Sequence, residues 1–469
     1  MVEIELKFQI SEARRTALLK ALDPKKSETI QLQAKYFDTP DRLLAQHGAA
    51  LRQRLEGTRW IQTLKAAGKS HLHRFEHNHN LGELESSPEL DLSIYQAIPE
   101  AQQILTQALG SDAAALKLTF ETDIQRTYRV IEFEDAEIEV CLDVGVVRAS
   151  GREQTIHEVE FELKSGSVQS LLAFSFEWVK KYQLWLDVRS KAEMGNLLAL
   201  EQTVSPARFE KEFVLSKKES AAHNLSLLIG QQMQHLLPNI AAISAGVAEQ
   251  SHIDQAQTAL EHLQLTLALF KDWNSNISDK WAMQLAAFKH QFDHLQHLQH
   301  MQSTLGAFLQ NPTTTENLAK DILYAQEKLG NLVKSTQNVH HYLELLTFSL
   351  SSHDQVQKQD LKTYAHNTLQ NQYRQLQESL NAADISHFES LDVLAQKIKE
   401  LKFSFPILTS IYDVKNLQKY SKALNDAQQA AHEYQILATS AAYIQQTELE
   451  ASDWFVLGWL TAKLEVYAD

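Results

Sequence analysis

The stretch MVEIELK, residues 1–7, alternates apolar and charged side chains along its length. Successive side chains of a β-strand point to opposite faces, so Glu3, Glu5 and Lys7 would share one face of such a strand. One strand of this kind is typical of a half-buried sheet with a solvated charged face. The stretch becomes informative because the same alternation recurs along the first 200 residues.

Later segments repeat this alternation of charged and apolar residues. The side chains that share the charged faces are Arg52, Arg54, Thr63, Lys65, Arg74, Glu76, Glu137, Glu139, Cys141, Asp143, Glu158, Glu160, Glu162 and Lys164. Five or more such strands favour a sheet that curls into a barrel, with its charged face lining a cavity. Acids on that face can hold divalent metal ions, and bases can hold phosphate oxygens.

Several short motifs, in order along the chain, resemble those of the CYTH family, also called triphosphate tunnel metalloenzymes. The motifs are EIELK at 3–7 (the family's ExExK signature), YFDT at 36–39, LRQR at 51–54, TLK at 63–65, EVEFE at 158–162 and SK at 190–191. The resemblance covers about residues 1–200. It implies an eight-stranded antiparallel β-barrel that encloses a triphosphate tunnel.

Local patterns predict the elements of this first region. Strands are expected at 1–8, 30–38, 50–56, 59–66, 72–79, 117–123, 125–134, 137–143, 145–148 and 154–164, and helices at 11–22, 43–46, 88–109 and 168–183, with a short helix after Ser190. Gly145 and Gly166 are interpreted as turns between strands.

The pattern changes beyond residue 212. We predict a tunnel domain at 1–200, a linker at 201–212, where Ser205-Pro206 interrupts any periodicity, and an all-α domain of bundle type at 213–469. Leu, Ala, Gln and His recur there at helical spacing, which indicates eight or nine helices. The fold class is therefore a multidomain combination of an α+β barrel domain and an all-α domain.

Composition limits the possible classes of function. The chain has 469 residues and a net charge of −15, so neither region is a basic nucleic-acid binder in bulk. No run of 18 apolar residues exists, so we expect no transmembrane helix, and the charged residues of 1–7 do not fit a signal peptide. The single cysteine, Cys141, fits a reducing cytoplasm, and we interpret it as a neutral barrel residue.

The helical region resembles a CHAD domain, an all-α domain that often follows CYTH. The resemblance rests on 254–270 and on a second stretch from Leu417 to Asp426. CHAD domains that bind polyphosphate carry rows of basic residues, whereas the corresponding positions here are Asp254, Gln257, Glu261, His262 and Gln264. We therefore expect a degenerate domain that has lost strong polyphosphate binding and serves packing or dimerisation. His294, His297 and His300 could suggest metal ligands, but no carboxylate cluster completes such a site.

A triphosphate needs dense positive charge, and acids beside those bases call for a metal ion. The bases expected to bind substrate are Lys7, Arg52, Arg54, Lys65, Arg74, Arg126 and Lys191, with Arg189 a weaker candidate. The acids expected to hold Mg²⁺ or Mn²⁺ are Glu3, Glu5, Asp143, Glu158, Glu160 and Glu162. Glu5, Lys7, Arg52 and Arg54 are assigned to catalysis. Either a second metal ion or a carboxylate such as Glu5 would position the attacking water. Glu76 is expected to orient Arg74 or Arg52.

The favoured function is metal-dependent hydrolysis of inorganic tripolyphosphate to pyrophosphate and phosphate. The same fold and motifs imply three enzymatic alternatives: a thiamine triphosphatase, a nucleoside triphosphatase or a class IV adenylate cyclase. A base- or ring-binding wall for these organic triphosphates is not obvious in the sequence. A non-catalytic polyphosphate-binding scaffold is a further alternative, but a pure binder would not need six carboxylates.

Overall fold

The computed structural model describes residues 2–68, 70–110, 112–306, 311–351, 360–384, 388–412, 418–446 and 449–466. Leu417, which opens the second CHAD-like stretch, lies outside these residues. The chain forms two compact units. The first contains 1–208, 237–252 and 333–347, and the second contains 209–236, 253–332 and 348–469. This division does not follow chain order, and the limits 1–200, 201–212 and 213–469 remain our proposal for the domains.

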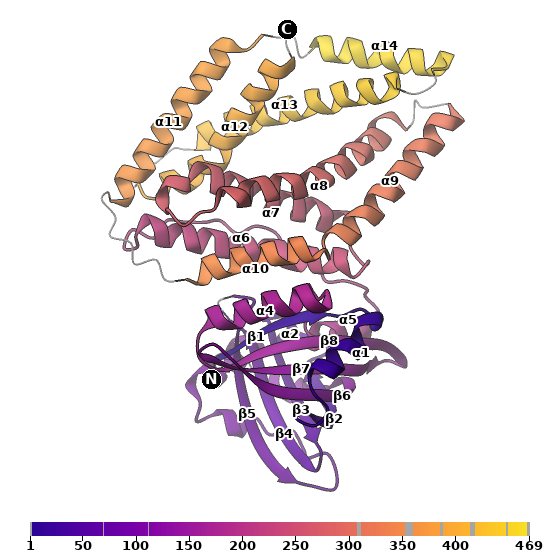
Figure 1. The fold of residues 1–469 in the computed structure, drawn as a ribbon, viewed down its shortest axis with the longest axis vertical. Helices are drawn as coiled ribbons and strands as arrows, with labels where there is room; N and C mark the ends of the chain where they lie inside the picture. Colours follow the sequence, from indigo (N-terminus) through magenta and orange to yellow (C-terminus); the bar gives the residue numbers. More distant parts are fainter. Residues whose placement is uncertain are drawn as a thin grey trace. The chain divides into compact units, whose positions relative to one another are not determined.

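Eight antiparallel strands close into a barrel in the first unit (Figure 1). The strands are β1 (Val2–Gln9), β2 (Glu28–Asp38), β3 (Ala49–Glu56), β4 (Arg59–Ala67), β5 (His73–Glu83), β6 (Lys117–Phe133), β7 (Ala136–Ala149) and β8 (Arg152–Ser165). Their order around the sheet is β5-β4-β3-β2-β6-β7-β8-β1, and β1 pairs again with β5, which closes the ring. A two-residue strand, β9 (Trp185–Leu186), adds to β1. The predicted barrel is confirmed.

Two predicted breaks between strands are wrong. The segments 117–123 and 125–134 form one continuous strand, β6, and the segments 137–143 and 145–148 form one strand, β7. Gly145 is not a turn, because it pairs with Ile124 of β6. A Cβ atom at Gly145 would lie 2.1 Å from the backbone oxygen of Asp123. The glycine therefore marks a close approach of two backbones.

Helices cover the outside of the barrel and one end of its interior. They are α1 (Glu12–Ala21), α2 (Leu43–Gln46), α3 (Pro99–Leu109), α4 (Val168–Tyr182) and α5 (Lys191–Ala199), with two 3-10 turns, η1 (Ser93–Tyr95) and η2 (Asp112–Ala115). The helix predicted at 88–109 is shorter than expected. It begins at Pro99, because proline favours the first helical position and disfavours helical backbone at the residue before it.

Strand alternation separates the apolar outside of the barrel from its charged interior. Leu51, Leu64 and Phe75 point outward and pack with Tyr95 and Leu109 of the covering helical segments. Inside, Met194 of α5 packs among inward-facing apolar residues of β2, β6, β7 and β8. Helix α5 therefore closes part of the interior with apolar side chains, and it carries Lys191 at its first residue.

Beyond residue 220, the regular elements of the described chain are all helices. They are α6 (Ala221–Ser244), α7 (Gln250–Leu269), η3 (Lys271–Trp273), α8 (Asp279–Leu305), α9 (Pro312–Leu332), α10 (Thr336–Leu350), α11 (Leu361–Ala382), α12 (Phe388–Thr409), α13 (Gln418–Gln445) and α14 (Ala451–Val466). The nine α-helices within the described residues agree with the predicted eight or nine. Over these same residues, the helices are too short or too polar to cross a membrane.

Candidate active site

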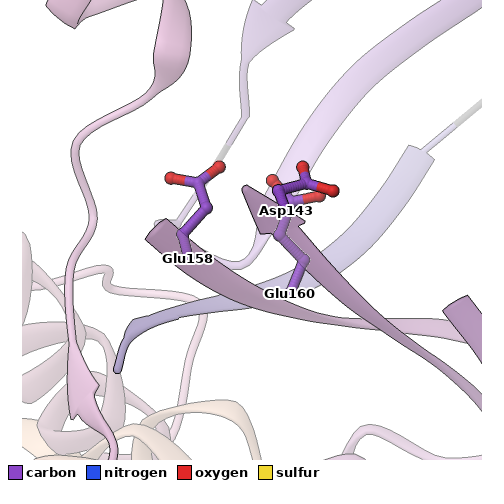
Figure 2. Close-up of side chains that lie close together, drawn as sticks. All are labelled: Asp143, Glu158 and Glu160. Atoms are coloured by element: carbon purple, nitrogen blue, oxygen red, sulfur yellow. The ribbon is translucent and has the colours of Figure 1, made fainter. Parts of the chain in front are cut away.

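The inward faces of the barrel strands bring the predicted charged residues together in separate groups. We call Asp143, Glu158 and Glu160 the three-acid cluster. Asp143 on β7 pairs in register with Glu158 on β8, and Glu160 follows two residues later on the same face (Figure 2). Asp143 and Glu158 are 0% exposed and Glu160 is 9% exposed, so three carboxylates lie inside the barrel wall.

Two bases contact the acids of the three-acid cluster. Arg126 of β6 donates from Nε to Oδ1 of Asp143 at 2.7 Å and also contacts Glu160. The Nζ atom of Lys191 lies 2.7 Å from Oδ2 of Asp143 and 2.8 Å from Oε1 of Glu160, and it contacts Glu158 as well. Three acids therefore share two basic groups at hydrogen-bond distance.

Burial and charge act in opposite directions on the pKa values of these acids. Burial raises the pKa of Glu158 to about 7, although the charges of Lys191 and Lys7 oppose the rise. Burial also disfavours the charged forms of Asp143 and Glu160, but Arg126 and Lys191 outweigh it and lower both pKa values. Two acids of the cluster are thus held ionised, while the third lies near its titration point at neutral pH.

The three-acid cluster fits a hard divalent cation. One ligand oxygen from each acid lies within 4.8 Å of the others, and oxygen ligands are those that Mg²⁺ and Mn²⁺ prefer. The second carboxylate oxygen of Glu158, Oε2, is buried without a hydrogen-bond partner in the described part of the chain. A buried acceptor of this kind needs a cation or a donor that the protein itself does not supply.

A second group, which we call the β1 cluster, comprises Glu3, Glu5, Lys65, Arg74 and Glu76. Lys65 lies 2.7 Å from Glu3 and 3.3 Å from Glu76, and Arg74 lies 3.2 Å from Glu5. Burial raises the pKa of Glu3 to about 8. Burial also opposes ionisation of Glu76, but Lys65 and Arg52 lower its pKa to about 2. This cluster also combines three acids with two bases.

The remaining predicted residues lie around these two clusters. Lys7 is buried and pairs in register with Glu160. Arg52 lies 3.8 Å from Glu76, and Arg54 contacts Glu56. In the described part of the protein, the Nε atoms of Arg52 and Arg54 are buried and lack hydrogen-bond partners. These two guanidinium groups therefore retain unused donors inside the barrel.

Two predicted residues are held in other ion pairs. Glu162 lies 2.8 Å from Lys164, which also lies 3.1 Å from Glu139. The structure therefore does not bring Glu162 into the three-acid cluster. Arg189 lies 2.7 Å from Asp187, and that pair occupies its side chain.

Comparisons with known proteins agree with this geometry. Residues 1–196 match the model of the CYTH domain, and residues 227–445 match the model of the CHAD domain. The chain contains a CYTH domain followed by a CHAD domain.

An inorganic triphosphatase from Haemophilus influenzae is 33% identical to the chain over 227 residues. The match covers 47% of this chain and 62% of that protein, so it spans less than two thirds of the relative. Among solved structures, the CHAD domain of Ricinus communis has a TM-score of 0.48 at 14% identity and covers 56% of this chain and 92% of its own. A Hippeastrum protein with a dominant triphosphatase activity has a TM-score of 0.30 at 17% identity, and the match covers 43% of this chain and 97% of that protein.

Tyr36 is a residue of the CYTH domain to which the sequence analysis gave no role. Its hydroxyl accepts a hydrogen bond from Arg52 at 3.3 Å, and its ring stacks on Phe120 at 4.4 Å between centroids. Burial disfavours the phenolate, but the charge of Arg52 outweighs it and lowers the pKa of Tyr36. The YFDT motif contains this tyrosine, and its pairing with Arg52 on β3 is the signal that could have identified it.

Two other motif residues have structural roles. Asp38 accepts hydrogen bonds from the backbone of Thr39, Leu44 and Ala45, which fixes the start of α2. Cys141 is buried, and burial raises the pKa of its thiol well above the usual value. A neutral thiol at this position agrees with the interpretation made from the sequence.

In the CHAD domain, two of the residues at the positions that correspond to the basic rows of polyphosphate-binding domains contact charged side chains of other helices. Glu261 lies 2.5 Å from Lys399 and 4.0 Å from Lys289, and Gln257 donates to Asp293 at 2.7 Å. The two lysines come from other helices, so sequence spacing did not reveal them. His300 lies against His432, with 5.6 Å between ring centroids. Within the described residues, the three-acid cluster is the group with metal-ligand geometry, and these histidines are not part of one.

Proposed function

We propose that the CYTH domain hydrolyses inorganic tripolyphosphate to pyrophosphate and phosphate with the help of Mg²⁺ or Mn²⁺. The observation that carries this proposal is the coexistence, inside one closed barrel, of unused guanidinium donors on Arg52 and Arg54 and an unused carboxylate oxygen on Glu158. A substrate with many phosphate oxygens would engage the donors, and a cation would engage the acceptor. A pure polyanion binder would gain nothing from the buried acids.

The bases of the tunnel would bind and orient the substrate. Arg52 and Arg54 would each grip phosphate oxygens with a planar fork, whereas Lys7 and Lys65 would act as point charges. We assign Arg74, Arg126 and Lys191 to substrate binding as well. Phosphoryl transfer requires little more of a protein than this positioning and charge neutralisation.

The acids would complete the reaction centre. Asp143, Glu158 and Glu160 would hold the divalent ion, with Glu3 and Glu5 of β1 and Glu162 of β8 as further candidate ligands. When bound, such an ion would neutralise phosphate oxygens and favour attack by water. Burial disfavours ionisation of Glu5, but Lys65 and Arg74 lower its pKa, so the carboxylate is ionised and can accept a hydrogen bond from a water molecule.

The substrate assignment is tested by measuring phosphate release from tripolyphosphate, ATP and thiamine triphosphate, each with Mg²⁺, Mn²⁺ or EDTA. We expect tripolyphosphate to be cleaved fastest and EDTA to stop the reaction. Faster cleavage of thiamine triphosphate or ATP would identify an organic triphosphatase, and formation of cyclic AMP from ATP would identify a cyclase.

For the CHAD domain we propose a role in packing or dimerisation, without strong polyphosphate binding and without nucleic-acid or membrane partners. The acid Glu261 lies between the two lysines Lys289 and Lys399 and offsets part of their charge. Residues 201–469 hold 20 Lys and Arg against 29 Asp and Glu, and this net charge of −9 also opposes long-range attraction of a polyanion. The single cysteine agrees with a reducing cytoplasm, which we propose as the location.

A further inference from the structure

The ammonium group of Lys191 lies among the carboxylates of the three-acid cluster. Its Nζ atom is 2.7 Å from Asp143 and 2.8 Å from Glu160, and it also contacts Glu158. The Lys191 side chain is 11% exposed, so water does little to replace these contacts. Lys191 is therefore, with Arg126, an internal counter-ion of the cluster.

A divalent ion would need the oxygens that Lys191 now uses. The ligand oxygens of the three acids, whose side chains are drawn in Figure 2, lie within 4.8 Å of one another, so a cation at a single position could contact all three. Two cations at that position would repel each other strongly because the surroundings are buried. Oε2 of Glu158 remains without a hydrogen-bond partner in the described residues, so Lys191 does not exhaust the capacity of the cluster for a cation.

The two bases at the cluster differ in how readily they can leave. Arg126 lies on strand β6 of the barrel wall and binds Asp143 through two nitrogen atoms, at 2.7 and 2.6 Å. Lys191 is the first residue of α5 and reaches the acids on a flexible four-carbon stem. Withdrawal of Lys191 would therefore free the acids without disturbing the barrel.

We propose that Lys191 is an exchangeable counter-ion, which occupies the metal position in the ligand-free protein and is displaced to the triphosphate when the metal binds. The inference rests on the metal site of the proposed function and deepens it. Metal and triphosphate then favour each other's binding, because the ion releases the lysine that the anion needs. The coupling is reciprocal by thermodynamic necessity.

The test measures Mn²⁺ binding to the full chain without substrate. Bound Mn²⁺ is determined from the loss of the electron paramagnetic resonance signal of free Mn²⁺. We compare the wild type with Lys191→Met, Lys191→Arg and Lys180→Met, the last being an exposed lysine of α4. Lys191→Met should bind Mn²⁺ at least about tenfold more tightly than the wild type. Lys191→Arg, which keeps the charge, and Lys180→Met should stay within about twofold. Adding Glu158→Gln to Lys191→Met should remove the gain.

Equal or weaker Mn²⁺ binding by Lys191→Met overturns the proposal. Circular dichroism establishes that each variant is folded, and Lys191→Gln replaces Lys191→Met if the latter does not fold. Phosphate release by the wild type is measured in parallel. If the wild type hydrolyses tripolyphosphate and the affinities are equal, the exchange fails while the function stands. If Lys191→Met gains affinity and no hydrolysis occurs, the function fails while the exchange stands.

Discussion

The interior of the barrel and the interior of the helical region bury different kinds of polar group. The barrel buries acidic and basic side chains, among them Glu5, Lys7 and Asp143. The buried polar residues described in the helical region are mainly Asn, Gln, Ser, Thr and His, with Asp453 as an exception that accepts from Asn311 at 2.8 Å. Buried charges cost several kcal/mol each unless they are well paired, whereas neutral groups need a hydrogen bond alone.

This difference indicates where the chain carries chemistry. The barrel keeps acids and bases in contact, with donors and acceptors left over on Arg52, Arg54 and Glu158. Such an arrangement lowers stability unless a ligand completes it, which favours a site. In the helical region the buried polar side chains are mainly neutral. Gln232, for example, donates from its amide to Thr266 at 2.8 Å, and its own Oε1 is buried without a partner in the described residues, so the contrast with the barrel lies in charge.

The largest effect is expected from the three-acid cluster. Glu160→Gln keeps the shape of the side chain and removes a charge that Arg126 and Lys191 contact, so hydrolysis should fall by at least about a hundredfold. Initial rates of phosphate release give the measurement. Glu153→Gln, at an exposed acid of the same strand, serves as the control and should retain full activity. Undiminished turnover by Glu160→Gln would remove the cluster from the mechanism.

A smaller loss is expected when a guanidinium group inside the barrel is replaced. Arg54→Lys retains the charge but loses the planar fork, so KM for tripolyphosphate should rise about tenfold. Arg59→Lys at the exposed first residue of the neighbouring strand β4 is the matched control, because Arg59 is 64% exposed. Equal KM values for the two variants would show that Arg54 does not contact the substrate.

The variant Glu162→Gln tests whether the three-acid cluster is functionally distinct from the other acids that line the barrel. Because the partner of Glu162 is Lys164 at 2.8 Å and not Arg126 or Lys191, Glu162→Gln should lower the rate by about fivefold or less, in the range of about 1 kcal/mol that a partly exposed ion pair contributes. The ratio of its rate to that of Glu160→Gln is the quantity to measure. A loss as large as that of Glu160→Gln would place Glu162 among the metal ligands.

The smallest effect on hydrolysis is expected from substitution of His341 in α10. This histidine is one of the buried polar residues of the helical region. Burial lowers the pKa of His341 to about 4, below the unfolded value of 6.5. The unfolded chain therefore binds a proton that the folded protein does not between these pH values. The contribution to stability is present above pH 6.5 and is lost as pH falls towards 4, by up to about 3 kcal/mol.

Melting temperatures at pH 7.5 and 5.0 test this dependence. His341→Gln, which cannot be protonated, should show a smaller fall in melting temperature over this interval than the wild type, with activity at pH 7.5 unchanged. His290→Gln, at an exposed histidine of α8, is the control and should behave as the wild type. The same fall in all three proteins would show that His341 is not buried in its neutral form.

The sequence predicted what depends on alternation and motif order. Period-two alternation placed Glu3, Glu5 and Lys7 on one face, and the order of the motifs implied the closed barrel. The sequence could not predict features that depend on how closely the backbones of two paired strands approach each other. Gly145 looks like a turn in one dimension, and its need to lie against Asp123 is visible once β6 and β7 are paired.

Contacts between elements that lie far apart in the sequence also could not be predicted from it. Lys191 lies 31 residues from Glu160, and the closing of the barrel interior by α5 brings them to 2.8 Å. The separation of Glu162 from the three-acid cluster likewise depends on Lys164 and Glu139, which carry no motif. Sequence reasoning therefore found the charged face, and the structure divided it into groups.

The most direct test of the central claim is ³¹P nuclear magnetic resonance of tripolyphosphate incubated with the full chain, first stripped of metal in EDTA and then supplied with Mg²⁺ or Mn²⁺. The account predicts no cleavage in EDTA and, after metal is added, equal amounts of pyrophosphate and phosphate. Unchanged cleavage by the stripped protein, or none with either metal, would contradict it.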